Sequence, residues 1–347
     1  AIEHLFDSVE EGDEVLIDGL NGSVIVNPTA ETKEKYKRLK QEIEKPICIE
    51  EYKPEPACTL DGVFVTLMAN VEHPNQVPLI YQNGLNGIGL FRTEFLALWH
   101  DSIPKEEEQI SIYKEMLRAM GRQSVTIRTL DIGADKRTST QQQCAGMNPA
   151  LGLRGIRRHI SHETDEFDIQ LRSILQASVE GPVRIMFPLV TTVEDIKNAK
   201  DHVFAVMEEL EQRNLPFSKD VKIGAMIEIP AAAISTREIL HEVDFISIGT
   251  NDLLQYVTGA DRNNPEVLSY YDPYNNSFIW LLGYIIKQAK EMGRTDDVYV
   301  CGELAANVEF IPTLLRLGYR ILSIAPVGVK KIRDSIAEIT VVDTLHQ

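Results

Sequence analysis

Short runs of apolar and β-branched residues recur along the chain and alternate with longer amphipathic stretches. The runs predict strands at 63–70, 87–94, 125–133, 183–190, 222–230, 245–252, 297–304 and 321–326. The stretches between them, such as 106–120 and 193–210, carry apolar residues at helical spacing. Nearly continuous apolar strands that alternate with helices predict a parallel sheet covered by helices. Eight such units over about 280 residues favour an α/β fold of the TIM type, a (β/α)8 barrel.

An open, doubly wound sheet is the alternative fold. It would need a GxGxxG phosphate turn after its first strand, and the sequence has none there. Ahead of the barrel, residues 14–27 read EVLIDGLNGSVIVN, two alternating runs around an Asn-Gly turn, which predicts a hairpin. A lone hairpin is only marginally stable in water, so we expect it to belong to another domain.

The segment after the hairpin is rich in charged helix formers, and Pro46 ends it. We therefore expect four parts: residues 1–30, the tail of another domain; 31–58, a linker helix and loop; 59–340, the barrel; and 341–347, a C-terminal tail. Because the chain starts AIEHLF without methionine, we expect it to be a piece of a longer protein.

Composition narrows the function classes. The chain has 347 residues, 44% of them hydrophobic, which is enough for a large core, and its formal net charge is −17. Nucleic acids and anionic membranes need basic surfaces, so we expect neither as a partner. The four cysteines, Cys48, Cys58, Cys144 and Cys301, form no CxxC pair, which is typical of a reduced, cytoplasmic chain. The run SFIWLLGYII is too short to span a membrane and predicts a core helix.

Polar residues gather where the predicted strands end. They are Arg92, Thr93 and Glu94 after the second strand, Arg128, Asp131 and Lys136 after the third, Glu228 after the fifth, Asn251, Asp252 and Arg262 after the sixth, and Cys301, Gly302 and Glu303 after the seventh. A single one of them could be a surface charge or a helix cap. Together they predict a site, because function in a barrel lies at the carboxyl ends of the strands.

These residue types suit one chemistry. Three arginines and a lysine can bind a doubly charged phosphate or carboxylate. Glu228 and Asp252 offer hard oxygen ligands for Mg²⁺. Cys301 could exchange a proton with substrate, although a lone cysteine is more often a small buried hydrophobe. The set therefore suggests phosphoryl transfer to or from a small phosphorylated carboxylic acid.

Six motifs occur in an order that points to a known family: GIGLFRTEFL, RTLDIGADK, NPALGLRGIR, MIEIPAA, ISIGTNDLLQY with DRNN, and VCGELA. Over roughly residues 60 to 335 the chain resembles enzyme I of the bacterial phosphoenolpyruvate:sugar phosphotransferase system, in its C-terminal phosphoenolpyruvate-binding barrel. The hairpin resembles the last strands of that family's swivelling phosphohistidine domain.

The resemblance implies a role for each matched residue. Arg92, Arg128, Lys136 and Arg262 would hold the phosphoryl group, Glu228 and Asp252 would bind Mg²⁺, Asn251 would contact substrate, Cys301 would protonate the enolate to give pyruvate, and Arg154 would line the site. It also implies a homodimer, and transfer first to a histidine and then to a histidine-containing phosphocarrier protein. His162 lacks the family's glycine-rich acceptor context, so we expect the acceptor histidine outside this chain.

Some features leave alternatives open. Met147 stands where the family usually has Glu, Ala134 stands where sugar-type members have Gly, and GADK with DRNN tilts toward the nitrogen-related branch. A dikinase or phosphoenolpyruvate synthase barrel is a second enzymatic interpretation. A non-catalytic barrel that senses a metabolite is a third, although a sensor does not need the proton donor Cys301.

Overall fold

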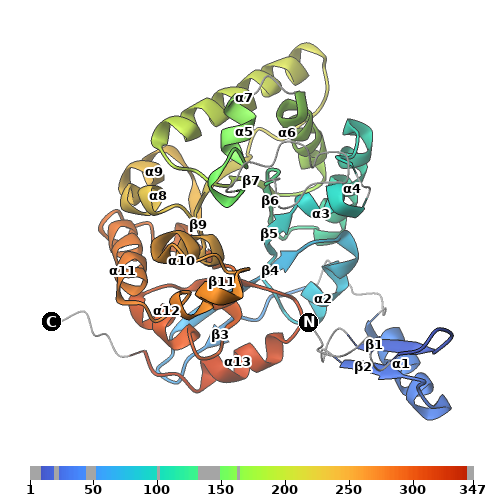
Figure 1. Ribbon diagram of the computed structural model, residues 1–347. Coiled ribbons are helices and arrows are strands. Elements are labelled where there is room, and N and C mark those ends of the chain that lie inside the picture. The colour runs from blue at the N-terminus through green and yellow to red at the C-terminus, as the bar shows by residue number, and fades with distance from the viewer. Residues whose placement is uncertain are drawn as a thin grey trace.

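The centre of the molecule is a closed ring of eight parallel strands (Figure 1). The computed structural model describes residues 9–18, 23–43, 52–99, 102–131, 149–161 and 165–341. The strands are β4 (Phe64–Val71), β5 (Ile88–Arg92), β6 (Val125–Arg128), β7 (Val183–Phe187), β8 (Lys222–Ile227), β9 (Phe245–Gly249), β10 (Val298–Cys301) and β11 (Ile321–Ile324). Each pairs with the next, and β11 pairs with β4. This closure confirms the predicted (β/α)8 barrel and excludes the open sheet.

Helices surround the ring. They are α2 (Val77–Gln82), α3 (Glu94–Trp99), α4 (Glu106–Met120), α5 (Ile156–Ser161), α6 (Asp165–Ala177), α7 (Val193–Gln212), α8 (Pro230–Ile234), α9 (Thr236–Glu242), α10 (Thr250–Thr258), α11 (Asn276–Glu291), α12 (Ile311–Leu317) and α13 (Val329–Ala337). The helices predicted at 106–120 and 193–210 are confirmed. Thr192 explains where α7 begins, because its side chain accepts a hydrogen bond from the Asp195 N–H.

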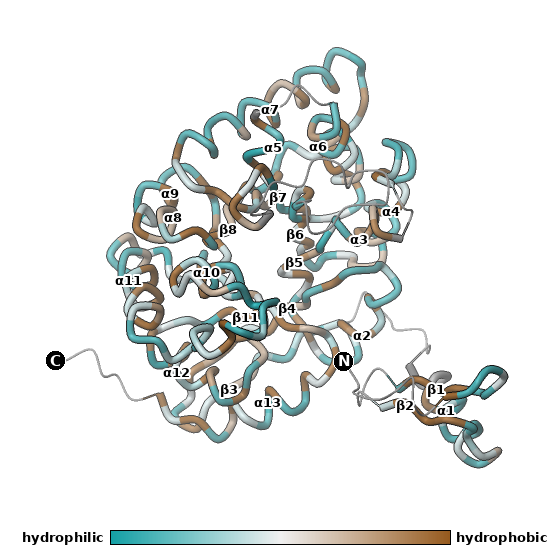
Figure 2. The backbone as a smooth tube through the Cα atoms, viewed as in Figure 1, coloured by the Kyte–Doolittle hydropathy of each residue, from teal (hydrophilic) through white to brown (hydrophobic). Residues whose placement is uncertain are grey.

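Apolar residues on the two faces of each strand fill two separate spaces. In β8, Ile223, Ala225 and Ile227 pack into the large cluster shared with the helices. Met226 faces the other way, into a small cluster inside the ring with Leu90, Met186, Phe245 and Cys301. In Figure 2 hydrophobic positions follow the strands and recur along outer helices such as α11. The predicted core helix SFIWLLGYII lies within α11, where Phe278, Leu282 and Ile285 are buried.

The N-terminal elements lie beside the barrel (Figure 1). β1 (Val15–Asp18) and β2 (Ser23–Val26) pair antiparallel, which confirms the predicted hairpin. α1 (Ala30–Ile43) follows, and the Tyr36 hydroxyl donates to the Asp18 carboxylate at 2.8 Å. Assignment of the hairpin to the tail of another domain stays a prediction. The sequence analysis missed β3 (Ala57–Cys58), which pairs antiparallel with β4 and is too short to show a periodicity. Within the described ranges, no helix is long and apolar enough to cross a membrane.

Candidate active site

A cavity of about 390 Å³ opens at the carboxyl ends of the barrel strands. Seven of the residues to which the sequence assigned a role line it: Arg92, Arg128, Glu228, Asn251, Asp252, Arg262 and Cys301. Asn70, Glu72, Asp131 and Glu303 also contribute polar groups to its wall. Residues that were selected because they follow predicted strands therefore lie around one cavity.

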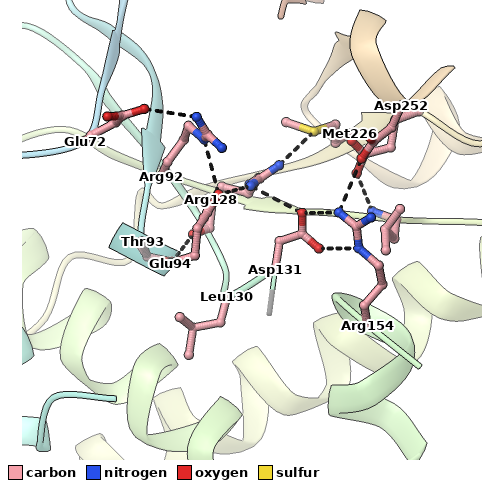
Figure 3. A network of polar contacts seen from close by, with 12 residues as sticks. Glu72, Arg92, Thr93, Glu94, Arg128, Leu130, Asp131, Arg154, Met226 and Asp252 are labelled. Atoms are coloured by element: carbon pink, nitrogen blue, oxygen red, sulfur yellow. Dashed lines mark hydrogen bonds and ion pairs between the residues drawn. The ribbon is translucent and has the colours of Figure 1, made fainter. Parts of the chain in front are cut away.

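Charged side chains of alternating sign run around this cavity, most of them labelled in Figure 3. In order, they are Glu72, Arg92, Glu94, Arg128, Asp131, Arg154, Asp252 and Arg262. Arg92 lies between two acids, with Nη1 at 3.0 Å from Glu72 Oε1 and Nε at 3.2 Å from Glu94 Oε1. Each arginine of the series is thus paired before any ligand is present.

The middle of this series is buried. Arg128 Nη2 lies 2.5 Å from Glu94 Oε1 and 3.3 Å from Asp131 Oδ2. Arg154 donates to both oxygens of Asp131, at 3.0 and 2.7 Å, and reaches Asp252 Oδ2 at 3.3 Å. Burial opposes the charge on Arg128, but the charges of Glu94 and Asp131 outweigh it, so its pKa is raised above the ordinary value. Arg128 therefore remains charged inside the protein.

Glu228 and Asp252 lie on neighbouring elements at the edge of the cavity. Glu228 is 2% exposed, and its Oε1 accepts a hydrogen bond from the Leu189 N–H at 2.7 Å. Burial, followed by the negative charge of Asp252, raises the pKa of Glu228 to about 7. Gly249 makes room for this carboxylate, because a Cβ at that position would lie 2.7 Å from Glu228 Oε2. A cation between the two carboxylates would relieve their repulsion.

Asn251 and Asp252 do not belong to a strand, which corrects the predicted strand 245–252. β9 ends at Gly249, and both residues lie in the first turn of α10. The apolar run predicted the strand correctly but could not show where the helix begins. Asn251 Oδ1 accepts from the Glu303 N–H at 2.9 Å, so its side chain is tied to the segment that follows β10.

Cys301 closes the floor of the cavity. Its side chain is 2% exposed and packs with Leu90 and Met226, and its Sγ lies 3.3 Å from the Ile248 carbonyl. Burial raises the pKa of the thiol to about 11. The thiol is therefore protonated and neutral near pH 7. The neighbouring Gly302 has φ +88°, and a Cβ there would lie 2.3 Å from Thr250 Oγ1.

Comparison with known proteins places the chain. Residues 49–341 match the family described as PEP-utilising enzyme, PEP-binding domain, where PEP is phosphoenolpyruvate. The chain belongs to this family. A phosphoenolpyruvate-protein phosphotransferase from Staphylococcus aureus is 42% identical over 335 residues, and one from Bacillus subtilis is 39% identical over 338.

These alignments cover 94% and 96% of this chain, but only 57% and 58% of the relatives, so the chain spans little more than half of their length. A citrate lyase from Burkholderia xenovorans LB400 has a similar structure, with a TM-score of 0.50 and 15% identity over 84% of this chain and 81% of that one. That likeness shows the fold alone.

Several other residues singled out in the sequence of this PEP-binding domain are not among the described residues that line the cavity. Lys136, Ala134, Met147 and His162 fall outside the described residues. Arg154 acts from behind the cavity wall, through Asp131 and Asp252. The sequence analysis gave no role to Asp131 and missed Asn70, near the end of the first barrel strand, and Glu72, which follows that strand. Applying the strand-end rule to that strand would have found Asn70 and Glu72.

The carboxylate pair fits a magnesium ion in this PEP-binding domain. Among the described residues, no group of three or more His, Cys, Asp or Glu side chains is arranged to hold a metal ion. Mg²⁺ commonly takes one or two protein carboxylates and fills its other positions with water and substrate phosphate. Glu228 and Asp252, whose proximity contributes to the raised pKa of Glu228, meet that requirement.

Proposed function

We propose that this domain binds phosphoenolpyruvate with Mg²⁺ and acts in a phosphoenolpyruvate-protein phosphotransferase. One observation carries the proposal. Three guanidinium groups, those of Arg92, Arg128 and Arg262, line the same cavity as a carboxylate pair and a protonated thiol. Guanidinium groups bind phosphate and carboxylate oxygens in a bidentate manner, and the ligand carries both kinds of group.

The charges of the site support a ligand that arrives with a divalent cation. Four arginines face five carboxylates, those of Glu72, Glu94, Asp131, Glu228 and Asp252. A phosphorylated carboxylic acid would add several negative charges to a site in which carboxylates already outnumber arginines. Mg²⁺ at Glu228 and Asp252 would offset them and would polarise the phosphoryl oxygens. The metal ion would then weaken the ion pair between Asp252 and Arg262, and the guanidinium of Arg262 would become available to the ligand.

The proposed reaction breaks the bond between phosphorus and the enol oxygen of phosphoenolpyruvate. The phosphorus forms a bond to a histidine nitrogen on another domain of the longer protein, and the arginines hold the charge of the moving group. The enolate left behind takes a proton at its methylene carbon from the Cys301 thiol, which gives pyruvate. The thiolate then recovers a proton from water.

The wider setting is proposed on the resemblance to the phosphotransferases. The phosphohistidine would pass its phosphoryl group to a histidine-containing phosphocarrier protein, in a cytoplasmic system for sugar uptake or in its nitrogen-related counterpart. The barrel would form a homodimer. No contact among the described residues bears on these partners.

Calorimetry with phosphoenolpyruvate, with and without Mg²⁺, tests the proposal. We expect saturable binding that needs Mg²⁺ and that weakens at least about tenfold in Arg262→Met, since charge-assisted hydrogen bonds are worth about 1.5–3 kcal/mol. Arg118→Met is the matched control, because Arg118 pairs with Glu180 at the surface, away from the cavity. Absence of binding by the wild-type chain, or equal binding by Arg262→Met, would contradict the proposal.

The sensor alternative needs a second experiment. The chain is mixed with Mg²⁺, phosphoenolpyruvate and a phosphohistidine domain from a relative, and pyruvate is measured. Formation of pyruvate together with phosphohistidine supports an enzyme. Binding without either product supports a sensor.

A further inference from the structure

The backbone N–H and carbonyl of Leu130 are hydrogen-bonded by side chains instead of by the sheet. The ladder between β6 and β7 ends at Arg128 with Met186, and one more bond joins the Thr129 N–H to the Met186 carbonyl. Beyond it, the Leu130 N–H donates to Gln170 Oε1 at 2.9 Å. The Leu130 carbonyl lies 3.0 Å from His159 Nε2, which must carry the proton because a carbonyl only accepts.

Gln170 also holds the neighbouring strand end. Its Nε2 donates to Thr93 Oγ1 at 3.1 Å, and Thr93 Oγ1 donates to the Arg128 carbonyl at 2.8 Å. One side-chain amide on α6 therefore joins the residue after β5 to the end of β6. Figure 3 shows Thr93 next to Glu94, and Leu130 below the charged side chains of the site.

These two strand ends carry the central part of the charged series. Glu94 follows Thr93, and Asp131 follows Leu130. Asp131 orients Arg154 through two bonds, and Glu94 orients Arg128. Bidentate contacts of this kind are lost when groups move by about an ångström, so the backbone that carries Glu94 and Asp131 must be fixed.

Gln170 and His159 both bury polar groups, which costs desolvation free energy that a position needed only for packing would avoid. Gln170 is fully buried, and His159 is 4% exposed. His159 Nδ1 is buried with no hydrogen-bond partner among the described residues, and its ring stacks on Phe167 at 4.6 Å. Burial lowers the pKa of His159 to about 4, so the ring stays neutral. An apolar side chain would avoid these desolvation costs, which suggests that the hydrogen bonds serve the site.

We propose that Gln170, with His159 on the other side of the Leu130 peptide, is a positioning residue of the anion site. It touches no substrate and acts by fixing Asp131 and Glu94, which in turn orient Arg154 and Arg128. The inference rests on the proposed function, because it holds that the hydrogen bonds of Gln170 and His159 serve ligand binding.

A matched pair of variants tests it. Gln170→Met removes the bonds to Leu130 and Thr93 at nearly constant volume, together with the bond that Gln170 Nε2 donates to the Tyr113 hydroxyl at 3.3 Å. Gln109→Met is the control, since Gln109 is also buried, at 2%, and its amide bonds the Pro104 carbonyl and Tyr113 instead of the two strand ends. We expect the affinity for phosphoenolpyruvate with Mg²⁺ to fall at least about tenfold in Gln170→Met and by less than about twofold in Gln109→Met, a difference of about 1 kcal/mol. Equal affinities in both variants would overturn the proposal.

A second variant keeps the test valid if Gln170→Met does not fold. His159→Phe keeps the ring stacked on Phe167 and removes only the bond to the Leu130 carbonyl. We expect the same direction of effect, with faster hydrogen exchange at the Leu130 amide in Gln170→Met. Unchanged affinity in a folded His159→Phe would contradict the role assigned to His159.

A ligand-free measurement separates this inference from the proposed function. If Gln170 positions Asp131 for Arg154, the stability losses of Gln170→Met and Arg154→Met will be less than additive in the double variant. Additive losses would overturn the inference even if phosphoenolpyruvate binds. Failure of the wild-type chain to bind phosphoenolpyruvate, with coupled losses, would overturn the proposed function and leave the coupling of Gln170 to Arg154 established.

Discussion

Asp252→Asn is the sharpest test of the site, because Asp252 joins the arginines to the proposed metal position. The substitution keeps the size of the side chain and removes its charge. A carboxamide oxygen is a weaker ligand for Mg²⁺ than a carboxylate. We expect the gain in phosphoenolpyruvate affinity that Mg²⁺ provides to vanish, with the affinity at saturating Mg²⁺ falling at least about tenfold, or about 1.4 kcal/mol.

The effect on stability follows from the partners that Asp252 leaves behind. Removing one member of a fully buried ion pair costs about 3–5 kcal/mol, whereas an exposed pair is worth about 0–1 kcal/mol. Arg262 keeps 29% of its side chain exposed, so water can replace Asp252. Arg154 keeps both bonds to Asp131. Loss of the repulsion with Glu228 offsets part of the cost. We therefore expect Asp252→Asn to lose about 1–2 kcal/mol.

Asp131→Asn is the comparison, measured in the same urea titrations. Asp131 is 1% exposed and pairs with two arginines whose side chains are 3% and 7% exposed. Water cannot replace it, so we expect a loss of about 3–5 kcal/mol. A larger loss for Asp252→Asn than for Asp131→Asn would refute this account of the network. An unchanged effect of Mg²⁺ on ligand affinity in Asp252→Asn would remove Asp252 from the metal site.

Three further predictions concern the same cavity. The folded-state pKa of Glu228 lies above its ordinary value, so its contribution to stability is complete below about pH 4.5 and is lost as the pH rises through about 7. Glu228→Gln should match the wild type at pH 4.5 and exceed its unfolding free energy at pH 8 by up to about 3 kcal/mol; a deficit at pH 8 would contradict the shift. Gly249→Ala should leave the fold intact but displace the Glu228 carboxylate, and calorimetry should show Mg²⁺-dependent binding weakened at least about tenfold; unchanged binding would mean that the carboxylate can move aside freely. Cys301→Ala should bind phosphoenolpyruvate within about twofold of the wild type but, with a phosphohistidine domain from a relative supplied, slow protonation of the enolate by about 10²- to 10⁴-fold, measured as deuterium incorporation into pyruvate; unchanged rate and facial selectivity would make Cys301 a packing residue.

The barrel could be predicted from the sequence because its strands are buried on both faces. Runs such as IGAMI and FISIG are mostly apolar and buried at every position, and the helices between them repeat with a clear period. Strand pairing then follows from chain order, since each strand neighbours the next. The residues at which strands end and helices begin were harder to predict from the sequence. Asn251 and Asp252 were predicted at the end of a strand, but they lie in the first turn of α10. The choice between strand end and helix start depends on long-range contacts, those of Thr250 with the Cys301 carbonyl and of Asn251 with Glu303.

The candidate site could be predicted as a set of residues but not as a network. Strand-end placement gave Arg92, Arg128 and Cys301, since parallel strands bring their carboxyl ends to one rim. It could not show that each arginine is already paired with an acid, because the pairing depends on where the folded chain directs each side chain, and some pairs, such as Arg128 with Glu94, join two strand ends. Gln170 was invisible for the same reason. It lies on a helix, among apolar residues, and only the folded chain shows that its amide reaches two strand ends.

The pairing of the arginines has a consequence for which anions the site can select. A guanidinium held by a carboxylate, such as Arg262 on Asp252, exchanges one negative partner for another when a monoanion enters. The Coulomb gain is then small, since the two interactions have similar distances and surroundings. A ligand with a phosphoryl group and a carboxylate can engage several arginines at once and can bring a cation that occupies the released carboxylates. Selection by charge would thus come from the acids of the site as much as from its arginines, because they set the threshold that a ligand must exceed.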